Sequence, residues 1–386
     1  MERERCIGCQ ACVDVCPKRC ITFDYDAWGE GKATIDFSKC IDCGLCAKIC
    51  PSRKIKFNDE QLEVYAVLSK ENRRKGSSGG FFYEIAKEFV RNGGIVYGAA
   101  FNKELKLKHI AVDNIPDIIP LCKSKYLHSD MTGIYKDIGS KLLQGQKVMF
   151  VGTPCQTSAV KNLYKEKYAG NLILIDFLCH GTGTQKIFDA CISEEEKIKN
   201  GKIKEFYFRS KSRRAEHSFT YILEQKGKNK EISGYSFEFP YYHSYLQYTI
   251  FNDYCYECKY ATETRVGDIT LGDFWGINKY NNKLKAEKGV SMICVNSLDG
   301  KTVFDTVKDK CNIWQYPLSN ASQNNESFIK PVKYPQRKSA LRSLMETKGE
   351  REVVQEMRCA HIKKNIIYSK CPKFVLRIYH FLRGRK

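Results

Sequence analysis

The sequence predicts a chain of mixed α and β structure in three parts, residues 1–60, 61–320 and 321–386. The first part contains two similar cysteine runs on either side of a short segment of alternating residues. The second part repeats a unit in which a short apolar run, typical of a buried strand, leads through a Gly-containing loop into an amphipathic helix. The third part is polar, rich in lysine and has helical spacing. We therefore expect a small α+β domain, a larger α/β domain with a mixed sheet, and a helical, basic C-terminal extension.

The first part carries two cysteine runs of the form C-x-x-C-x-x-C-x-x-x-C-P, one starting at Cys6 and the other at Cys40. This spacing is typical of bacterial two-cluster ferredoxins, in which the fourth cysteine of each run ligates the other 4Fe-4S cluster. Structural zinc and disulfides are the alternatives, but zinc sites use separated pairs and need no third cysteine in the same turn. The sequence therefore predicts a ferredoxin-type domain with two crosswise ligand sets. They are Cys6, Cys9, Cys12 and Cys50 for one cluster, and Cys40, Cys43, Cys46 and Cys16 for the other.

The segment between Cys16 and Cys40 consists of two short alternating stretches around a Gly-containing turn. This pattern predicts a β-hairpin. We expect the N-terminal domain to end near Phe57. A polar stretch at residues 69–75 is then expected to link it to the second part of the chain.

The second part begins with the Gly-rich sequence GSSGGFF, residues 76–82, which is expected to open an amphipathic helix. Apolar runs at residues 95–101, 147–152 and 172–181 are predicted strands, and the last two lead through short loops into helices. Residues 203–248 alternate with many aromatic side chains and are predicted to form antiparallel strands. In a largely parallel or mixed sheet the loops gather at the carboxyl edge of the strands, where ligands bind.

The composition limits the class of function. The formal charge is +20, and a basic surface attracts anionic partners such as acidic ferredoxins, nucleotides, nucleic acid or lipid headgroups. No apolar run has membrane-spanning length, and the residues after Met1 lack the apolar core of a secretory signal. We therefore expect a cytoplasmic protein whose 19 cysteines indicate metal ligation, since disulfides are disfavoured in that compartment. The mildly amphipathic basic tail, residues 374–386, is a weak candidate for contact with a membrane surface.

Four further cysteines stand at predicted loop positions in the second part. Cys155 and Cys179 each follow a predicted buried strand, so their thiols could converge, and the C-x-x-C pair Cys255 and Cys258 could complete a set of four. A single C-x-x-C pair is weak evidence, so the spacing leaves a metal site and ordinary cysteines as open alternatives. The remaining cysteines have no partner at a ligand spacing and are expected to be ordinary small residues. They are Cys20, Cys122, Cys191, Cys294, Cys311, Cys359 and Cys371.

The motifs of the second part, taken in order, resemble one known family. They are GSSGGFF (76–82), SKYLHS (124–129), GTPCQ (152–156), CHG (179–181), CYECKYA (255–261) and GDITLGDFWG (267–276). This series is similar to that of the beta-subunit family of deazaflavin-coenzyme hydrogenases and dehydrogenases, and it covers most of residues 62–320. One departure is Lys123, which stands where the family is expected to have glycine. The resemblance implies a flavoprotein domain that binds FAD and a third 4Fe-4S cluster, with Cys155, Cys179, Cys255 and Cys258 as the cluster ligands.

The Gly-rich loop adds a physical argument for the flavin site. At the start of a helix, unpaired N–H groups, a positive helix end and absent Cβ atoms let the backbone approach a pyrophosphate closely. A flexible helix cap is the alternative interpretation. With the resemblance, the predicted contacts of the cofactor are Ser77, Ser78, Gly79 and Gly80, together with Lys125 and Tyr126 of the SKYLHS motif.

The resemblance also suggests residues for the flavin ring and the substrate. Lys125 is a candidate for the flavin phosphate or the ring edge, where an ammonium near N1 would stabilise reduced flavin; a surface lysine is the alternative. Asp268, Asp273 and Trp275 could orient flavin or substrate, although acidic turn residues also act as caps. His180 could donate a proton near the flavin, or be a solvated loop residue. The predicted catalytic residues are therefore His180, Lys125 and Asp273.

These cofactors predict a function in electron transfer. Clusters transfer single electrons, whereas a flavin handles one or two. We expect electrons from a ferredoxin or another redox protein to enter at the N-terminal domain, pass through the third cluster to FAD, and reduce a small organic acceptor such as the deazaflavin coenzyme. The reverse direction is equally allowed. The protein is thus predicted to be an iron-sulfur flavoprotein oxidoreductase. The main alternative is a non-catalytic electron-transfer subunit of a larger redox complex. The positive charge leaves a nucleic-acid binder as a second alternative, but the motifs lead us to expect no nucleic-acid partner.

Overall fold

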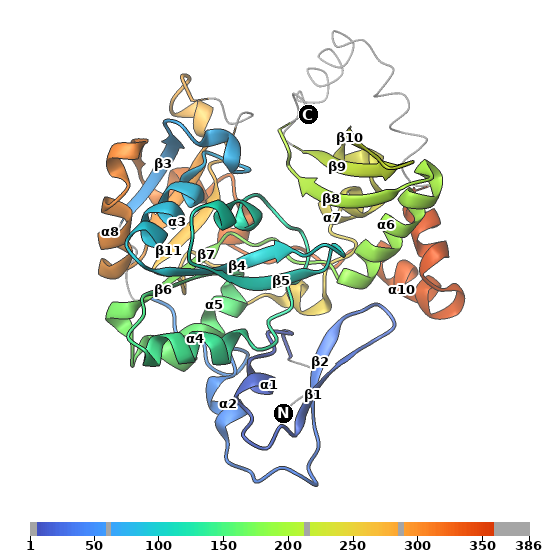
Figure 1. Ribbon diagram of the computed structural model, residues 1–386, viewed down its shortest axis with the longest axis horizontal. Coiled ribbons are helices and arrows are strands. Elements are labelled where there is room, and N and C mark those ends of the chain that lie inside the picture. Colours follow the sequence, from blue (N-terminus) through green and yellow to red (C-terminus); the bar gives the residue numbers. More distant parts are fainter. Residues whose placement is uncertain (1–5, 59–62, 212–216, 285–288, 359–386) are drawn as a thin grey trace.

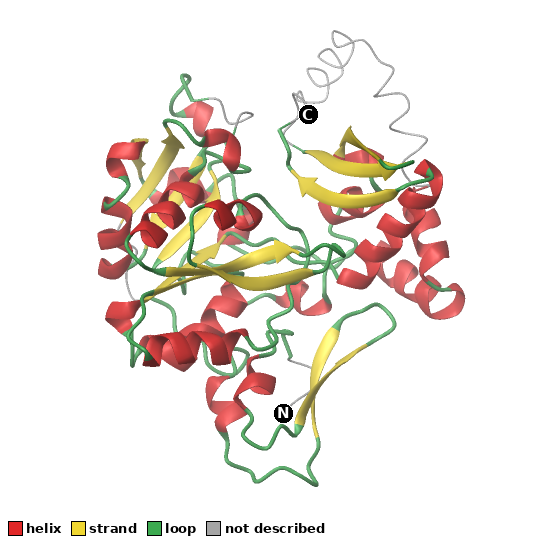
Figure 2. Cartoon of the chain, viewed as in Figure 1, coloured by secondary structure: helices red, strands yellow, loops and turns green. Residues whose placement is uncertain are grey.

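The computed structural model describes residues 6–58, 63–211, 217–284 and 289–358. Figure 1 shows three regions: an N-terminal domain at the bottom of the view, a large sheet with its helices on the left, and a smaller lobe of strands and helices on the right. Figure 2 shows helices and strands mixed through the sheet region, as the sequence predicts for a domain of the α/β type.

The N-terminal domain consists of two short helices and a hairpin. Strands β1 (Ile21–Tyr25) and β2 (Gly31–Ile35) pair antiparallel, so the predicted hairpin is confirmed. Helices α1 (Ala11–Val15) and α2 (Leu45–Ile49) end at the fourth cysteine of their runs with nearly the same backbone angles, φ −68° and ψ 113° in one and φ −65° and ψ 117° in the other. The duplication in the sequence is therefore also a duplication of local structure.

The large region is built on an eight-stranded mixed sheet with the order β13-β3-β12-β11-β7-β6-β4-β5. Strands β4, β6, β7 and β11 run parallel, and the other neighbours pair antiparallel. The parallel strands are mostly apolar because both faces of the sheet are covered. The bounds are β3 (Glu63–Ser69), β4 (Ile95–Phe101), β5 (Leu107–Val112), β6 (Val148–Val151), β7 (Leu172–Phe177), β11 (Ile269–Asp273), β12 (Ser291–Val295) and β13 (Cys311–Tyr316).

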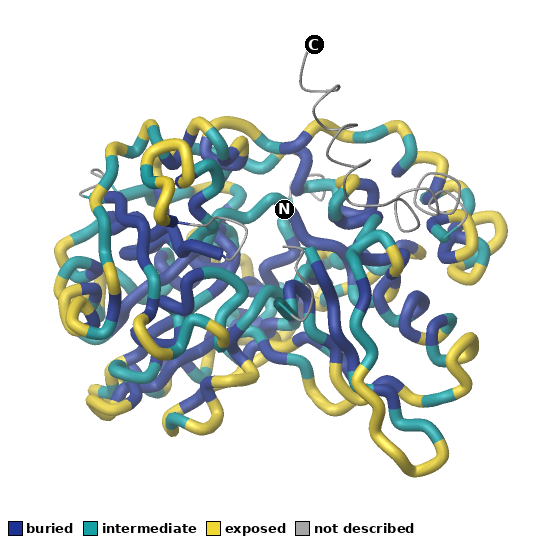
Figure 3. The backbone as a smooth tube through the Cα atoms, turned by 90° about the horizontal axis from the view of Figure 1, so that it is seen from above, coloured by how far each residue is buried: buried dark blue, intermediate teal, exposed yellow. Residues whose placement is uncertain are grey.

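Helices cover both faces of this sheet. On one face, α3 and α8 pack against the strands through residues such as Phe81 and Phe304. On the other face, α4 and α5 pack through residues such as Tyr135 and Val160. Figure 3 shows the resulting interior, with buried segments in dark blue and exposed turns in yellow around them. The bounds are α3 (Phe81–Arg91), α4 (Ile134–Leu143), α5 (Pro154–Val160) and α8 (Leu298–Asp305).

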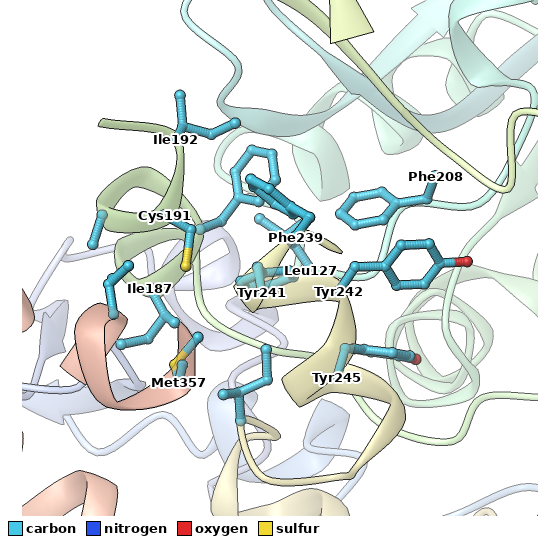
Figure 4. Packing of buried hydrophobic residues seen from close by; sticks show 14 of the residues in the cluster. Leu127, Ile187, Cys191, Ile192, Phe208, Phe239, Tyr241, Tyr242, Tyr245 and Met357 are labelled. Carbon is cyan, nitrogen blue, oxygen red and sulfur yellow. The ribbon is translucent and has the colours of Figure 1, made fainter. Parts of the chain in front are cut away.

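A second lobe carries an aromatic core. Strands β8, β9 and β10 form an antiparallel sheet, and residues of α6, α7 and α10 share one buried cluster with it. Figure 4 shows part of this cluster, with Phe239 and Tyr241 in the middle of the view and Met357, of the helical residues 350–358, below Ile187. The bounds are α6 (Gln185–Lys199), β8 (Lys202–Phe208), β9 (Ser218–Gln225), β10 (Lys228–Tyr235), α7 (Pro240–Leu246), α9 (Leu318–Ser322) and α10 (Gln336–Lys348).

Two predictions about these regions are wrong in detail. Residues 203–248 are not strands throughout, because β10 ends at Tyr235 and Pro240 opens α7; proline suits the first turn of a helix, where its missing N–H is not needed. Residues 69–75 are not an interdomain linker, because they join β3 to α3 within the sheet region. There the Ser69 hydroxyl donates a hydrogen bond to the Glu84 carboxylate of α3.

The C-terminal extension is helical in α10 and residues 350–358. Residues 359–386 lie outside the described residues, and with them the basic tail predicted to contact a membrane surface. Within the four described ranges, no helix combines the length and the apolar character that a membrane crossing requires.

The N-terminal domain has a defined position against the sheet region. The buried carboxylate of Asp14 accepts hydrogen bonds from the N–H groups of Gly133 and Tyr135, at 3.0 and 3.1 Å, at the start of α4. Free N–H groups in the first turn of a helix favour a negative charge there. The Tyr135 hydroxyl donates in turn to the carbonyl of Cys9 at 2.7 Å. The first cysteine run is therefore held directly on the larger region.

Candidate iron-sulfur and flavin sites

The first predicted ligand set comes together in the N-terminal domain. Burial raises the pKa of the Cys9 thiol, and the neighbouring thiols of Cys12, Cys50 and Cys6 raise it further. Thiols this close repel one another when ionised, so they are stable as thiolates only around a positive centre. The four residues fit the ligand set of an iron-sulfur cluster.

The second predicted set lies nearer the surface. Burial raises the pKa of Cys46, and Cys40 and Cys43 contribute as neighbours. Cys16 approaches from the first run: its sulfur is 3.4 Å from that of Cys20, which in turn neighbours Cys40. Cys43 is exposed and Cys16 is buried. The set therefore faces solvent on one side, and Cys20, expected to be an ordinary residue, lies directly beside it.

The third predicted set is assembled at the carboxyl edge of the sheet. Cys155 lies in the first turn of α5, where Thr153 caps the helix. Cys179 follows β7, whose parallel neighbour β6 leads into α5, so the two loops start side by side. Cys255 lies on a short 3-10 turn, residues 253–257, and Cys258 follows directly after it. Three loops from distant parts of the sequence thus contribute one set of thiols.

These four thiols line one cavity of about 310 Å³. Burial raises the pKa of Cys255, and the thiols of Cys179, Cys258 and Cys155 raise it further. Within the described part of the chain, no three His, Cys, Asp or Glu side chains are arranged around a single metal ion. A cubane is larger than an ion and its ligands stand further apart, so an all-thiol set around a cavity fits a 4Fe-4S cluster.

The third set faces the N-terminal domain. Ile7, Pro51 and Ile55 of that domain form part of the wall of the same cavity. Pro51 follows Cys50, a predicted ligand of the first set, and its carbonyl accepts a hydrogen bond from the Tyr260 hydroxyl at 3.2 Å. The first and third sets are therefore neighbours across the boundary between the two regions.

A second cavity, of about 460 Å³, adjoins the first at the carboxyl edge of the parallel strands. Thr153 and residues 179–182 line both cavities, so one short segment forms the wall between them. Most of the predicted flavin residues line the second cavity: Ser77, Ser78, Gly80, Lys125, Tyr126, His180, Asp273 and Trp275. Gly79 and Asp268 are not among its lining residues.

The Gly-rich loop is held by residues distant in sequence. The N–H of Ser124, in the SKYLHS motif, donates to the Ser77 hydroxyl at 2.7 Å. The ammonium of Lys211 donates to the carbonyl of Ser78. Gly80 caps α3 with φ 88°, a left-handed conformation that favours glycine. Two motifs that the resemblance grouped together thus form one wall of the cavity.

Gly79, predicted as a cofactor contact, does not line the second cavity and packs against the sheet. A Cβ on this residue would lie 2.1 Å from the carbonyl oxygen of Val67 and 2.7 Å from the amide nitrogen of Ser291, both in strands of the sheet. Its own N–H donates to the Ser291 hydroxyl at 2.9 Å. The missing side chain therefore lets the loop pack onto β3 and β12, and it supports the cavity from behind.

Lys125 and Tyr126 are both fixed in place. The Lys125 ammonium donates to the carbonyls of Pro120 and Cys122, each at 2.7 Å, and burial lowers its pKa to about 7. The ring of Tyr126 stacks on that of Tyr245, with centroids 4.2 Å apart. Lys125 is therefore a cavity residue that can gain or lose a proton near neutral pH.

Asp273 forms a buried ion pair with Arg209, a residue that no motif indicated. Arg209 Nη2 donates to Asp273 Oδ1 at 3.1 Å, and Nη1 donates to the other carboxylate oxygen. Burial raises the pKa of Asp273, but the guanidinium outweighs this and holds it below its usual value. The guanidinium lies 5.6 Å from the centre of the Trp275 ring. Arg209 Nε has no hydrogen-bond partner among the described residues, so one buried donor at this cavity is unused.

Three residues near this cavity escaped the sequence reasoning: Arg209, Lys211 and His217. His217 lies with its ring 6.2 Å from that of Trp275, and burial lowers its pKa to about 4, so it is neutral at neutral pH. All three belong to the second lobe, next to the ends of β8 and β9. The sequence carries no spacing signal for them, because their position depends on how the lobe sits over the sheet.

Asp268, predicted as a cofactor contact, does not line the second cavity, and its contacts in the structure are with the sheet and its helices. Its carboxylate pairs with Lys165 at 2.9 Å, and it accepts hydrogen bonds from the N–H of Leu174 at 2.8 Å and the hydroxyl of Ser297 at 2.7 Å. These contacts tie β11 to β7 and α8. Asp268, just before β11, thus supports the sheet, whereas Asp273, at the end of β11, lines the second cavity.

His180 occupies the wall between the two cavities. Burial lowers its pKa, so the imidazole tends to be neutral. A histidine here touches both the predicted third cluster site and the predicted flavin site. Its predicted role as a proton donor is compatible with this position.

Two parts of the chain match families of known proteins. Residues 5–54 match the model of the 4Fe-4S dicluster domain. Residues 145–320 match the model for the C terminus of the Coenzyme F420 hydrogenase/dehydrogenase beta subunit. The resemblance indicated by the motifs is confirmed, and the beta-subunit match includes the loops of the third cysteine set, whereas residues 76–82 and 124–129 precede it.

One similar solved structure is a chain of the F420-reducing NiFe hydrogenase complex from Methanosarcina barkeri, studied as a xenon derivative. It is 14% identical, with a TM-score of 0.45, and the alignment covers 77% of this chain and 91% of that chain. No curated protein matches the sequence. The family matches relate the chain to subunits of oxidoreductases and identify its N-terminal domain as an iron-sulfur dicluster domain.

Proposed function

We propose that this chain is an iron-sulfur flavoprotein that passes electrons between a redox protein and a small organic acceptor. The observation that carries the proposal is the continuous order of its sites. The first thiol set adjoins the cavity of the third set, and that cavity shares the wall at residues 179–182 with the second cavity. Electron transfer needs short steps between centres, and this order supplies them.

In this proposal each set of residues holds one cofactor. The two sets of the N-terminal domain and the set at Cys155, Cys179, Cys255 and Cys258 ligate 4Fe-4S clusters, and the second cavity holds FAD. When bound, the clusters supply single-electron transfer and the flavin couples it to two-electron chemistry. The dicluster-domain match supports the iron-sulfur part, and the cavity with its unused Arg209 donor supports an anionic, planar ligand.

The side chains of the second cavity have separable roles. The hydroxyls of Ser77 and Ser78 and the start of α3 offer donors to phosphate oxygens. Trp275 and the Arg209 guanidinium offer an apolar face and a charge to the flavin or the acceptor. Lys125 and His180 are the residues able to hold or release a proton beside the bound ring.

The direct test is the content of iron, sulfide and flavin in anaerobically purified protein. We expect about twelve irons and one FAD per chain, since each 4Fe-4S cluster contributes about four. The visible spectrum before and after reduction should show both chromophores. About twelve irons without flavin would contradict the flavoenzyme and leave a non-catalytic electron-transfer subunit. About eight irons would contradict the third cluster.

The partner that supplies electrons is proposed to bind at the exposed face of the second set. Phe37 and Ile41, which flank Cys40 in sequence, are 76% and 57% exposed, and Cys43 is also exposed. The exposed cations Lys18 and Lys39 lie in the loops before β1 and after β2. These loops are joined by a hydrogen bond from the N–H of Asp36 to the carbonyl of Cys20, at 2.8 Å. A small apolar patch with a basic rim suits a transient contact with an acidic electron carrier.

Substitutions in this patch should slow the reduction of the clusters by a protein donor and leave the rate of their reduction by a small molecule unchanged. With a reduced acidic ferredoxin as the donor, the variant Phe37→Ser/Ile41→Ser/Lys39→Glu should be reduced about tenfold more slowly than wild type, a change of about 1.4 kcal/mol. Dithionite should reduce both at the same rate. Leu143→Ser, at a residue that is 72% exposed elsewhere, is the control and should behave as wild type. Equal rates with the ferredoxin would place its docking site on another face.

A further inference from the structure

Cys20 is one residue outside the predicted ligand sets that is nevertheless placed at a cluster. Its sulfur lies 3.4 Å from the sulfur of Cys16, and its side chain is 3% exposed. Cys16 and Cys20 belong to one small buried cluster, against which Cys40 packs. Cys20 is therefore in contact with one ligand of the second set and next to another.

The local backbone explains this position. After Cys16 the chain turns back at Arg19, whose N–H donates to the Cys16 carbonyl at 3.2 Å and whose φ is 50°, in the left-handed region. A non-glycine residue is uncommon in this region, because its Cβ crowds the following carbonyl oxygen. The turn returns the next side chain, Cys20, to the cluster side just before β1 begins.

The internal repeat provides a comparison within the same molecule. The corresponding ligand of the other half is Cys50, and four residues later stands Lys54, which is exposed. There the N–H groups of Arg53 and Lys54 both donate to the Cys50 carbonyl at 3.1 Å, and Arg53 does not have a positive φ. One half of the duplicated domain thus has a spare buried thiol, and the other half has a solvated cation at the same position.

We propose that Cys20 is a reserve ligand of the second 4Fe-4S cluster, able to replace Cys16. The inference rests on the proposed second cluster. In the exchange the iron–sulfur bond to Cys16 breaks and one to Cys20 forms, and the proton of the Cys20 thiol passes to the released Cys16 thiolate, 3.4 Å away in the structure. No electron is gained or lost. The other cluster has no such reserve at its crosswise ligand.

An ordinary buried cysteine is the competing interpretation, because cysteine is among the most often buried residues. Cys191 illustrates it: this residue is fully buried in the aromatic core of the second lobe and is not part of any thiol set. Cys20 differs because its sulfur touches that of a ligand. The two interpretations predict different iron contents when Cys16 is removed.

The test compares iron content and the low-temperature electron paramagnetic resonance spectrum of reduced, anaerobically purified variants. Cys16→Ala should keep the wild-type iron content and show a changed spectrum, whereas Cys50→Ala should lose about four irons. Cys16→Ala/Cys20→Ala should also lose about four, and Cys20→Ala alone should keep all. Loss of a cluster in Cys16→Ala as in Cys50→Ala would overturn the proposal, as would loss of a cluster in Cys20→Ala alone.

A second measurement leaves Cys16 in place, in case its removal prevents folding. During slow oxidation with ferricyanide, Cys20→Ala should release iron several-fold faster than wild type, and Cys191→Ala should release it at the wild-type rate. Equal rates for Cys20→Ala and wild type would count against a reserve ligand. The two proposed clusters of the N-terminal domain require about eight irons in the wild-type protein. If these irons were absent, the clusters themselves would be contradicted, and not only the role of Cys20.

Discussion

Cys155→Ala should remove one complete cluster, about four irons per chain, and leave both clusters of the N-terminal domain in place. The reason is the closed arrangement of the third set, in which all four thiols line the same cavity and neighbour one another. Losing one of four ligands leaves three thiols whose ionised forms repel one another at low dielectric. Cys258→Ala, on another loop, should have the same effect.

The measurement is iron and sulfide content together with the spectrum of the reduced protein. Cys191→Ala is the control, because it removes a buried thiol from the second lobe, outside every predicted ligand set, and should keep all the iron. The proposal further predicts that reduced ferredoxin still reduces the N-terminal clusters of Cys155→Ala but no longer the flavin. Unchanged iron in Cys155→Ala would contradict the third cluster. Unchanged flavin reduction would contradict its place in the electron path.

Asp273→Leu should destabilise the protein and also empty the flavin site. Asp273 and Arg209 form a largely buried, two-point ion pair, and removing one partner leaves an uncompensated charge, which costs about 3–5 kcal/mol. The double variant Arg209→Met/Asp273→Leu should recover most of the free energy of unfolding, because a buried ion pair and an apolar pair of similar size are often equally stable. It should not recover flavin, since the cavity loses its guanidinium.

Urea unfolding and flavin content of the folded fraction are the two measurements for this prediction. Asp268→Asn is the control: it breaks a buried network away from the cavity, so stability should fall while flavin remains. The pH dependence has a defined sign. The pKa of Asp273 is lowered in the folded protein, so its contribution is present above the unfolded pKa and is lost as the pH falls through the folded pKa. The double variant should lack this acid-dependent loss, and full flavin content in it would contradict the site.

Several features of this protein are determined by short stretches of sequence. The eight cysteines of the N-terminal domain lie in two runs, and the hairpin between them follows from alternating residues around a turn, so both could be predicted from local spacing. The strands β6 and β7 and the helices after them follow from apolar runs and loop residues. In each case the interacting residues are close in the chain, so the pattern itself carries the information.

The sequence was less informative where several segments meet. Spacing alone left the third cysteine set undecided, and the resemblance was needed to group Cys155, Cys179, Cys255 and Cys258. Gly79 and Asp268 belong to the right motifs, but their backbone and carboxylate contacts serve the sheet. Residues 203–248 look like strands throughout because buried aromatic residues produce a similar pattern in strands and in a short buried helix.

The sequence by itself determined the dicluster domain, the mixed α and β character of the larger region and the resemblance of residues 145–320 to the beta-subunit family. Only the tertiary structure decided that Arg209, Lys211 and His217 of the second lobe meet the Gly-rich loop and Trp275, and that Cys20 touches Cys16. The physical reason is that ligand spacing and periodicity act within a few residues, whereas these contacts depend on how separate segments pack. The order of the sites, from the N-terminal thiols through residues 179–182 to the second cavity, is likewise a product of that packing.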